Sequence, residues 1–386
     1  MNRPGFLDYY RARKIIPTRQ DLSDLTPHFN RRRALYLQLG LAPALLRGRS
    51  VLEFGPGPGD NALFTASAKP DSYVFVDGNE TSLAHIREKE AAGAFDGIKV
   101  EMHLTDFLGF QDNRKFDVVL AEGCIHGQEN PGECLDHIAG FTAPGGVLVT
   151  TMQSFASVFP EICRRMVKPL FARRHPDFND QVAALVAFFQ PDLASLNGMS
   201  RLHEDWVMDQ ILHPYRKFTF TIAEAIDLLG DRFDFFGSSP RFLSDWRWYK
   251  SMDGEDPGIN ARAREIYHAN QAALLDYRVS PDNLGTCDGE KLEHLCAEAF
   301  DLHLDIWDND DVGELPRFCE KTEEIAAVVA SASPETARSL RDFVTGITAL
   351  ANDNGDSDFG TFRQLFGRGL QFASFVRRDE TNGGAE

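Results

Sequence analysis

The feature that most constrains the fold is a turn with glycines at alternate positions, Glu53-Phe-Gly-Pro-Gly-Pro-Gly59. It follows a short apolar run, 51–54, and precedes a segment of helical character, 61–69. Glycines lack a Cβ, so the chain can turn sharply there and a ligand can approach the backbone closely. The amides that open the following helix then point toward the carboxyl edge of the sheet. The turn therefore predicts a ligand site at that edge.

Apolar and helical stretches alternate from residue 50 to about residue 150. We expect strands at 51–54, 73–77, 99–104, 116–122 and 145–152, with helices at 61–69, 81–93 and 133–141. Short apolar strands separated by helices are typical of a parallel sheet that is covered on both faces. Right-handed crossovers make such a sheet doubly wound. The predicted class is α/β, with a doubly wound, Rossmann-like sheet.

The rest of the chain is expected to add helical parts to this core. The predicted organisation is a basic helical cap segment at 1–49, the core at 50–154, a helical insertion at 155–217 and the last helix and strands of the core at 218–251. The last two strands are expected at 233–239 and 245–251. An α-helical C-terminal region is expected at 259–380, after a linker rich in Gly, Pro and acidic residues.

The glycine spacing distinguishes between two kinds of nucleotide site. The dinucleotide fingerprint G-x-G-x-x-G needs a third glycine at position 60, which is Asp60. The pattern E-x-G-x-G-x-G after the first strand instead resembles motif I of class I S-adenosylmethionine-dependent methyltransferases. Further matches follow in order at 77–78, 106–107, 122–123 and 143–146, so the resemblance covers roughly residues 50–151. It implies a Rossmann-like methyltransferase sheet with S-adenosylmethionine as cofactor.

The resemblance also implies which residues bind this cofactor. An acid at the end of the second strand, Asp77, binds the ribose hydroxyls, because a carboxylate accepts two hydrogen bonds at once. Asp106 contacts the adenine amino group, and its neighbour Phe107 packs on the ring. The complete set of implied cofactor residues is Glu53, Gly55, Gly57, Gly59, Asp77, Gly78, Asp106, Phe107, Glu122 and Gly123.

One residue beyond the fourth strand is a candidate for the chemistry. Methyl transfer from a sulfonium is an in-line displacement, so the protein mainly aligns the nucleophile with the methyl group. His126 lies beside the expected position of that methyl group, and the ordinary pKa of histidine is near neutral. We expect His126 to act as a base or to orient the acceptor. The alternative is that it caps the following helix or fills the loop.

Further side chains are candidates for contacts with the methyl acceptor. Aromatic rings suit sugar or ring substrates, and arginine binds phosphate or carboxylate groups. For each residue the alternative is a place in the core or in a surface loop. The candidates are His203, Glu204, Asp205, Trp206, His213, Trp246, Trp248, Tyr249 and Arg368.

Charge distribution limits the class of partner. The formal net charge is −18, yet the first fifty residues hold ten Arg or Lys and three acids. An acidic body argues against a broad nucleic-acid surface. The cluster Arg31-Arg32-Arg33 suits a small anionic acceptor, and its alternative is a solvated helix face.

Targeting and metal signals are absent from the sequence. No apolar run approaches the roughly 20 residues that span a bilayer, and the N-terminus lacks a signal-peptide core. We therefore expect a cytoplasmic protein without a transmembrane segment. The six cysteines form no metal-site spacing, so no metal is expected.

The predicted function is an S-adenosylmethionine-dependent methyltransferase, O-directed on a small or glycan-type acceptor, neutral or anionic. The chain loosely resembles methyltransferases encoded with bacterial cell-surface polysaccharide genes. One alternative is a protein or RNA methyltransferase, although the sequence AEGCIHG lacks the N-P-P-Y-type turn of many amino-directed nucleic-acid enzymes. Another alternative is an S-adenosylmethionine-binding regulatory or scaffold protein without turnover. A homo-oligomer is compatible with each of them.

Overall fold

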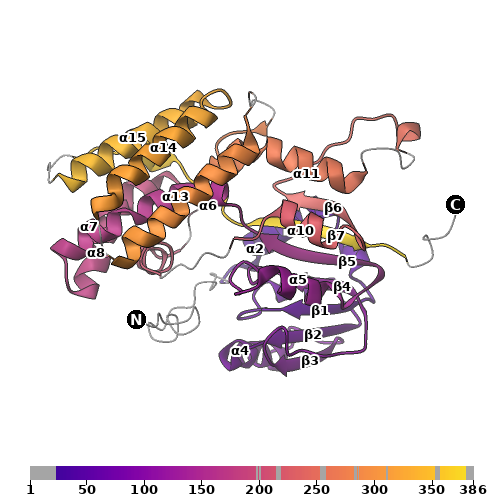
Figure 1. The fold of residues 1–386 in the computed structure, drawn as a ribbon. Coiled ribbons are helices and arrows are strands. Elements are labelled where there is room, and N and C mark those ends of the chain that lie inside the picture. Colours follow the sequence, from indigo (N-terminus) through magenta and orange to yellow (C-terminus); the bar gives the residue numbers. More distant parts are fainter. Residues whose placement is uncertain are drawn as a thin grey trace. The chain divides into compact units, whose positions relative to one another are not determined.

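The structure, a computed structural model, describes residues 23–196, 199, 201–213, 219–252, 258–281, 285, 287–309, 312–352 and 357–379. The chain forms two compact units, which Figure 1 shows as ribbons. Among the described residues, the sheet unit comprises those within 23–153, 219–267 and 370–379. The helical unit comprises the described residues within 154–213 and 268–369. The expected insertion and most of the C-terminal region thus belong to one helical unit.

The sheet unit is built on a single mixed sheet. Its strands are β1 (Ser50–Phe54), β2 (Ser72–Asp77), β3 (Lys99–Leu104), β4 (Phe116–Ala121), β5 (Thr142–Met152), β6 (Phe233–Ser239) and β7 (Gln371–Arg377). The strand order is β3-β2-β1-β4-β5-β7-β6. The strand pairs are parallel from β3 to β5, whereas β7 is antiparallel to both β5 and β6. The predicted α/β class with a Rossmann-like sheet is confirmed.

The strands bury both of their faces, as their apolar runs predict. On one face, side chains such as Val51, Phe75 and Leu120 pack with Tyr36 and Phe64 in one apolar cluster. On the other face, Phe54 lies against aromatic rings from the loop after β3 and from the residue that precedes β5. The helical elements of this unit are α2 (Leu25–Gln38), η1 (Pro43–Leu45), α3 (Ala62–Ser67), α4 (Glu80–Ala91), α5 (Pro131–Ala139), α10 (Ile222–Leu229), η3 (Tyr249–Ser251) and α11 (Ile259–Ala269).

The prediction of a strand at 245–251 is wrong. This segment ends in the short helix η3, and its rings are exposed, with Trp246 at 93%. The strand that completes the sheet is β7, from the region predicted to be helical up to residue 380. β7 is inserted between β5 and β6, so most of its side chains are buried on both faces.

The helical unit has one continuous apolar core of its own. Its helical elements are α6 (Phe155–Arg165), α7 (Val167–Arg174), α8 (Phe178–Ser195), α9 (His203–Trp206), η2 (Val207–Ile211), α12 (Gln271–Leu275), α13 (Gly289–Asn309), η5 (Val312–Glu314), α14 (Leu315–Val329), α15 (Pro334–Ala351) and η6 (Gly360–Gln364). The helix α8 continues through Pro191.

A buried arginine joins the two sequence segments of the helical unit. The Nε atom of Arg164 lies 3.0 Å from a carboxylate oxygen of Asp192, and its Nη1 atom donates to the carbonyl of Leu365 at 2.8 Å. The guanidinium also lies 3.8 Å from the ring centroid of Phe366. A buried charge needs such partners because it has lost its water.

Among the described residues, no helix is both long and apolar enough to cross a lipid bilayer.

Candidate functional site

The glycine turn lies at the carboxyl end of β1 and depends on its glycines. Gly55, Gly57 and Gly59 have φ angles of 65°, 56° and 77°, a region that favours glycine. A Cβ on Gly55 would lie 3.2 Å from the ring of Phe107, and one on Gly59 would lie 2.9 Å from Ile86. Side chains at these positions would therefore strain the backbone and fill the turn. The local sequence thus keeps the backbone of the turn uncovered.

The acid that ends β2 lies beside this turn. The carboxylate of Asp77 accepts a hydrogen bond from the amide of Asn79 at 2.8 Å and one from the backbone of Gly57. The residue is 9% exposed, and burial raises its pKa while these hydrogen bonds lower it. The structure therefore brings together the glycine turn and the predicted ribose-binding acid.

The residues after β3 lie near the same turn. Phe107 meets Phe54 edge to face, with ring centroids 5.7 Å apart. Asp106 is exposed, and one of its carboxylate oxygens accepts from the amide of Gly109 at 2.6 Å. At Gly78 an added Cβ would find nothing nearer than 3.8 Å, so the backbone is open there. This arrangement suits a planar ring placed against Phe107.

The predicted motif IV acid takes part in a buried ion pair. The guanidinium of Arg32 in α2 contacts both carboxylate oxygens of Glu122, at 2.7 and 2.8 Å. The two side chains are only 7% and 6% exposed. The next residue, Gly123, has a φ of 73°, and its amide donates to the hydroxyl of Thr151 at 2.6 Å. Glu122 is thus fixed at the end of β4.

The acid that opens the glycine motif is buried next to this pair. The hydroxyl of Tyr73 donates to the carboxylate of Glu53, which is 4% exposed. Burial, and then the negative charge of Glu122, raise the pKa of Glu53 to about 7, although Tyr73 and Arg32 oppose the shift. The site therefore gathers more acidic groups than the single guanidinium of Arg32 neutralises.

The candidate catalytic histidine is neutral at ordinary pH. Burial lowers the pKa of His126 to about 4. Its Nδ1 atom is buried and has no hydrogen-bond partner among the residues that the structure describes. The helix α5 begins after Asn130 with no side-chain cap, so the alternative that His126 caps this helix is wrong. His126 can offer a lone pair or an N–H to a ligand.

Several acceptor candidates have structural roles instead. Trp206 is buried in the helical unit, 5.6 Å from Phe189 between ring centroids. The guanidinium of Arg368 donates to three backbone carbonyls, those of Ala273, Tyr277 and Val279. Arg368 therefore has a structural role, because its Nε and Nη2 atoms are occupied by these carbonyls.

The other acceptor candidates fall into two groups. His203, Glu204 and Asp205 form the short helix α9 of the helical unit. His213 is buried there, and its carbonyl accepts from Arg165 at 2.6 Å. The aromatic residues of the sheet unit are exposed, namely Trp246, Trp248 and Tyr249.

The prediction that Arg31-Arg32-Arg33 act as one cluster is wrong, because the structure separates Arg32 from the other two. Arg31 and Arg33 are exposed, whereas Arg32 is 6% exposed and paired with Glu122. Sequence reasoning also missed His28 and Tyr36, which α2 buries together with Arg32. The available signal was their spacing of four residues, which places all three on one side of a helix.

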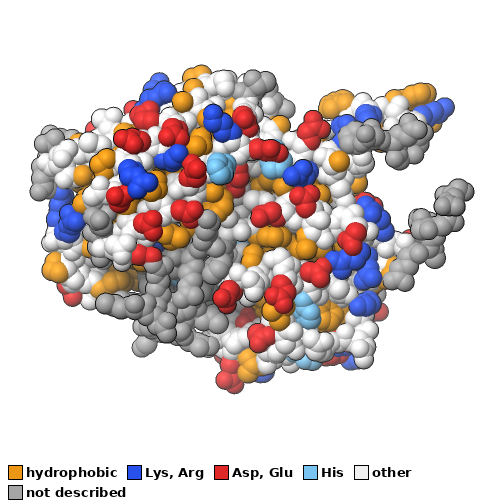
Figure 2. Space-filling model, viewed as in Figure 1, with side chains coloured by type: hydrophobic (Ala, Val, Ile, Leu, Met, Phe, Trp, Pro, Cys, Tyr) orange, Lys and Arg blue, Asp and Glu red, His pale blue; other side chains and the backbone are white. Residues whose placement is uncertain are grey.

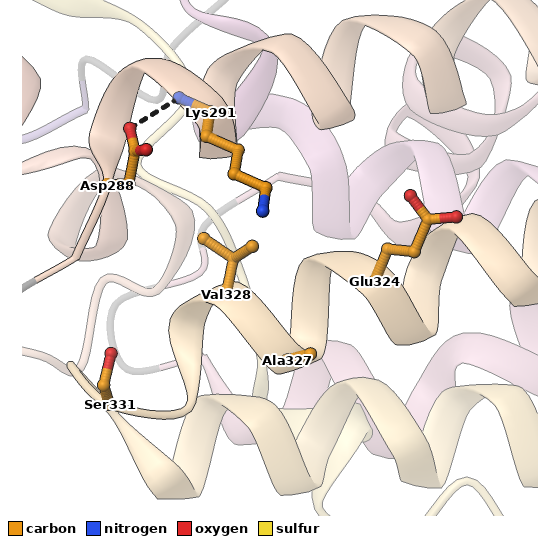
Figure 3. A pocket seen from close by; sticks show the side chains of 6 residues that line it. All are labelled: Asp288, Lys291, Glu324, Ala327, Val328 and Ser331. Atoms are coloured by element: carbon orange, nitrogen blue, oxygen red, sulfur yellow. Dashed lines mark hydrogen bonds between the residues drawn. The ribbon is translucent and has the colours of Figure 1, made fainter.

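A surface cavity of about 480 Å³ lies elsewhere, in the helical unit. Figure 3 shows Lys291 of α13 extending over Ala327 and Val328 of α14, with Glu324 opposite. Its polar lining residues are exposed, and none of them is a predicted site residue. Among the described residues, no group of His, Cys, Asp and Glu is arranged to hold a metal ion.

A comparison with protein-family models matches residues 27–235 to the methyltransferase domain, which is more than half of the chain. The matched range includes the glycine turn, Asp77, Asp106, Glu122 and His126. The chain belongs to this methyltransferase family. The predicted methyltransferase family is thus confirmed. A search of curated proteins finds no match to the methyltransferase.

Solved structures show partial similarity to the methyltransferase. PKMT2 from Rickettsia typhi, solved with AdoHcy, is 13% identical at a TM-score of 0.45, over 61% of this chain and 49% of that one. The CcbJ methyltransferase from Streptomyces caelestis is 28% identical at a TM-score of 0.28, over 33% of this chain and 50% of that one. Magnesium protoporphyrin IX methyltransferase from Synechocystis PCC 6803, with bound SAH, is 15% identical at a TM-score of 0.36, over 63% and 89%. The chain spans about half the length of the first two.

The raised pKa of Glu53 predicts a pH-dependent stability. Folded Glu53 keeps its proton up to about pH 7, whereas an unfolded glutamate ionises near its ordinary pKa of 4.5. The free energy of unfolding therefore falls as the pH rises through this window, because the folded state binds more protons. In Glu53→Gln this decrease should be smaller. Melting temperatures at pH 5 and pH 8 measure the difference.

The control is Glu161→Gln in the helical unit, because burial raises the pKa of Glu161 to about 7 as well. Each single variant should remove part of the decrease, and the double variant should remove more. An unchanged pH dependence in Glu53→Gln would contradict the assignment of a protonated Glu53.

Proposed function

We propose that this methyltransferase binds S-adenosylmethionine at the glycine turn and transfers its methyl group to a small or glycan-type acceptor. The observation that carries the proposal is the position of Asp77, a buried carboxylate beside Gly57 at the end of β2. A turn whose glycines leave the backbone uncovered, next to a carboxylate for two hydroxyl groups, fits a nucleoside with an intact ribose. Bound S-adenosylmethionine supplies an activated methyl group on a sulfonium.

The residues around the turn divide the work of binding. The backbone from Gly55 to Gly59 lies against the cofactor, and Asp77 holds the ribose hydroxyls. The ring of Phe107 covers one face of the adenine, with Asp106 at its amino group. Alignment of nucleophile and methyl group then accounts for much of the rate, because positioning converts a bimolecular encounter into an intramolecular step.

Asp77→Ala should weaken the binding of S-adenosylmethionine and of its demethylated product by about 1.5–3 kcal/mol, because two ribose hydroxyls lose their acceptor. Isothermal titration calorimetry measures the change, and Asp96→Ala, an exposed acid of the same unit, is the control. A melting curve confirms that each variant is folded. Absent binding in the unchanged protein, or tighter binding of a nicotinamide dinucleotide, would refute the proposal.

For the acceptor we propose an oxygen nucleophile on a small or glycan-type molecule, as in methyltransferases encoded with polysaccharide genes. The neutral imidazole of His126 supports this choice, because it can accept a hydrogen bond from a hydroxyl group without first losing a proton. Figure 2 shows acidic and basic side chains interspersed over the face in view, which suits a small acceptor better than a nucleic acid.

His126→Ala should lower turnover by about 10²-fold or more, with little change in melting temperature or cofactor affinity. His126→Gln is the matched variant, since it keeps a hydrogen-bonding group but cannot take up a proton. The assay follows transfer of a labelled methyl group to a panel of glycans and lipid-linked or nucleotide-linked sugars. Near-normal turnover in a variant that melts many degrees lower would show that His126 has a structural role.

The exposed arginines of α2 support an anionic group on the acceptor. Arg31→Gln with Arg33→Gln should raise the acceptor KM about tenfold and remove its dependence on salt, because exposed charges attract phosphate through a screened interaction. Arg47→Gln is the control, since this arginine is also exposed. An unchanged KM at low salt would contradict an anionic acceptor.

Two other outcomes of the methyl-transfer assay would favour the alternative functions. Transfer of the labelled methyl group to protein or RNA would replace the glycan hypothesis. Cofactor binding without any methyl transfer would favour a regulatory protein.

A further inference from the structure

Three aromatic rings are exposed together on the sheet unit, in the segment that follows β6. Trp246, Trp248 and Tyr249 are 93%, 65% and 70% exposed, and they lie within four residues of one another in the chain. We call these three residues the aromatic patch. Single exposed apolar side chains are common on protein surfaces, whereas a group of them marks an interaction site. The proposed cofactor site uses none of these rings, so the aromatic patch needs a role of its own.

The start of this segment is packed against the rest of the sheet unit. The ring of Phe242 lies against the ring of Phe235 in β6, with centroids 5.4 Å apart. It also lies 5.7 Å from the ring of Tyr267 in α11. These contacts hold the chain in place just before the aromatic patch begins.

A second anchor lies within the aromatic patch itself. The carboxylate of Asp245 accepts hydrogen bonds from the guanidinium of Arg247, the shortest at 2.7 Å. The same carboxylate pairs with Arg262 of α11 at 3.6 Å. The backbone is thus fixed on both sides of Trp246. A surface that is ordered in advance loses little conformational freedom when it binds a partner.

The charges around the aromatic patch do not favour an anionic partner. Asp245 neutralises Arg247, and the Nζ atom of Lys250 lies over the ring of Trp248, 5.2 Å from its centroid. The whole chain has a net charge of −18. Nucleic acids and anionic lipid surfaces attract a basic face instead. Trp, Tyr and Arg are the residue types that dominate the centres of protein–protein interfaces, so a protein partner fits better.

The aromatic patch is also complementary to itself, as a contact between two identical copies related by a two-fold axis requires. Aromatic rings attract one another edge to face or offset, and a cation is attracted to the face of a ring. The patch offers rings together with the cation of Lys250. The pair of Asp245 and Arg247 carries no net charge, so two copies can meet there without repulsion.

The area of the rings is of the right size for such a contact. Since about two-thirds or more of each ring is exposed, the six rings of two copies can bury roughly 700–1,100 Å². Stable interfaces bury about 1,200–2,000 Å², and exposed neighbours such as Met252 add to the area of the rings. We propose that two copies of this chain associate through their aromatic patches about a two-fold axis.

Sedimentation velocity of the full chain over a hundredfold range of concentration tests the proposal, because a dimer forms by mass action. The unchanged protein should reach twice the mass of one chain. Trp246→Ser combined with Trp248→Ser should weaken the dimer by about a hundredfold or more, because tryptophans dominate the energy of interfaces. The control is Leu104→Ser, an exposed apolar position in β3 at the opposite edge of the sheet, which should dimerise as the unchanged protein does.

Two results of this experiment would overturn the proposal. One is a protein that stays monomeric at every concentration. The other is a dimer that the double variant forms as tightly as the unchanged protein, because the contact would then use another face. Melting curves show that the variants are folded, as expected for substitutions of exposed side chains.

A second measurement locates the contact without any variant. Oxidation of Trp246 by hydroxyl radicals, followed by mass spectrometry, should slow as the concentration is raised through the range in which the dimer forms. Oxidation of Tyr277, an exposed ring of the helical unit, should not change. Oxidation of Trp246 that is equally fast in monomer and dimer would overturn the proposal. Equally slow oxidation at every concentration would also overturn it, because the chain itself would then cover the ring.

Discussion

The ion pair between Arg32 and Glu122 is the interaction on which the site depends. It joins the helix before the sheet to the end of β4, and Tyr36 extends the connection to α3. Removing one partner of a buried pair leaves an uncompensated charge, which is strongly destabilising. The same pair fixes the carboxylate of Glu122 close to Glu53. The arrangement of α2, the glycine turn and β4 is therefore one electrostatic unit.

This electrostatic unit contains buried acidic groups whose ionised forms are unfavourable in the absence of a ligand. Glu53 lies within the field of Glu122, and burial opposes its ionisation. The pKa of Asp77 is raised as well, because its burial outweighs its hydrogen bonds. Groups that lack compensating charge in a folded protein are often those that meet a ligand. A ligand with positive charge near these carboxylates would relieve the repulsion.

The sequence alone was sufficient to predict those site residues whose positions follow from local secondary structure. The glycine turn and Asp77 lie at the ends of adjacent strands, and strand periodicity placed them there without knowledge of tertiary contacts. The sequence alone was insufficient where the role of a side chain depends on contacts with residues far away in the chain. Arg32 differs from Arg31 and Arg33 only in the side of the helix that meets Glu122, ninety residues away. Arg368 resembled a ligand clamp because the carbonyls that occupy it lie far back along the chain.

The strand β7 has a consequence for the order of folding. It fills the gap between β5 and β6, pairing Leu148 with Phe375 and Phe235 with Phe375. Because a chain is synthesised from its N-terminus, every residue of the helical unit emerges before this strand does. Until then the facing edges of β5 and β6 are unpaired, which is a recognised risk for aggregation. During synthesis the sheet unit therefore cannot be completed before the whole helical unit has emerged.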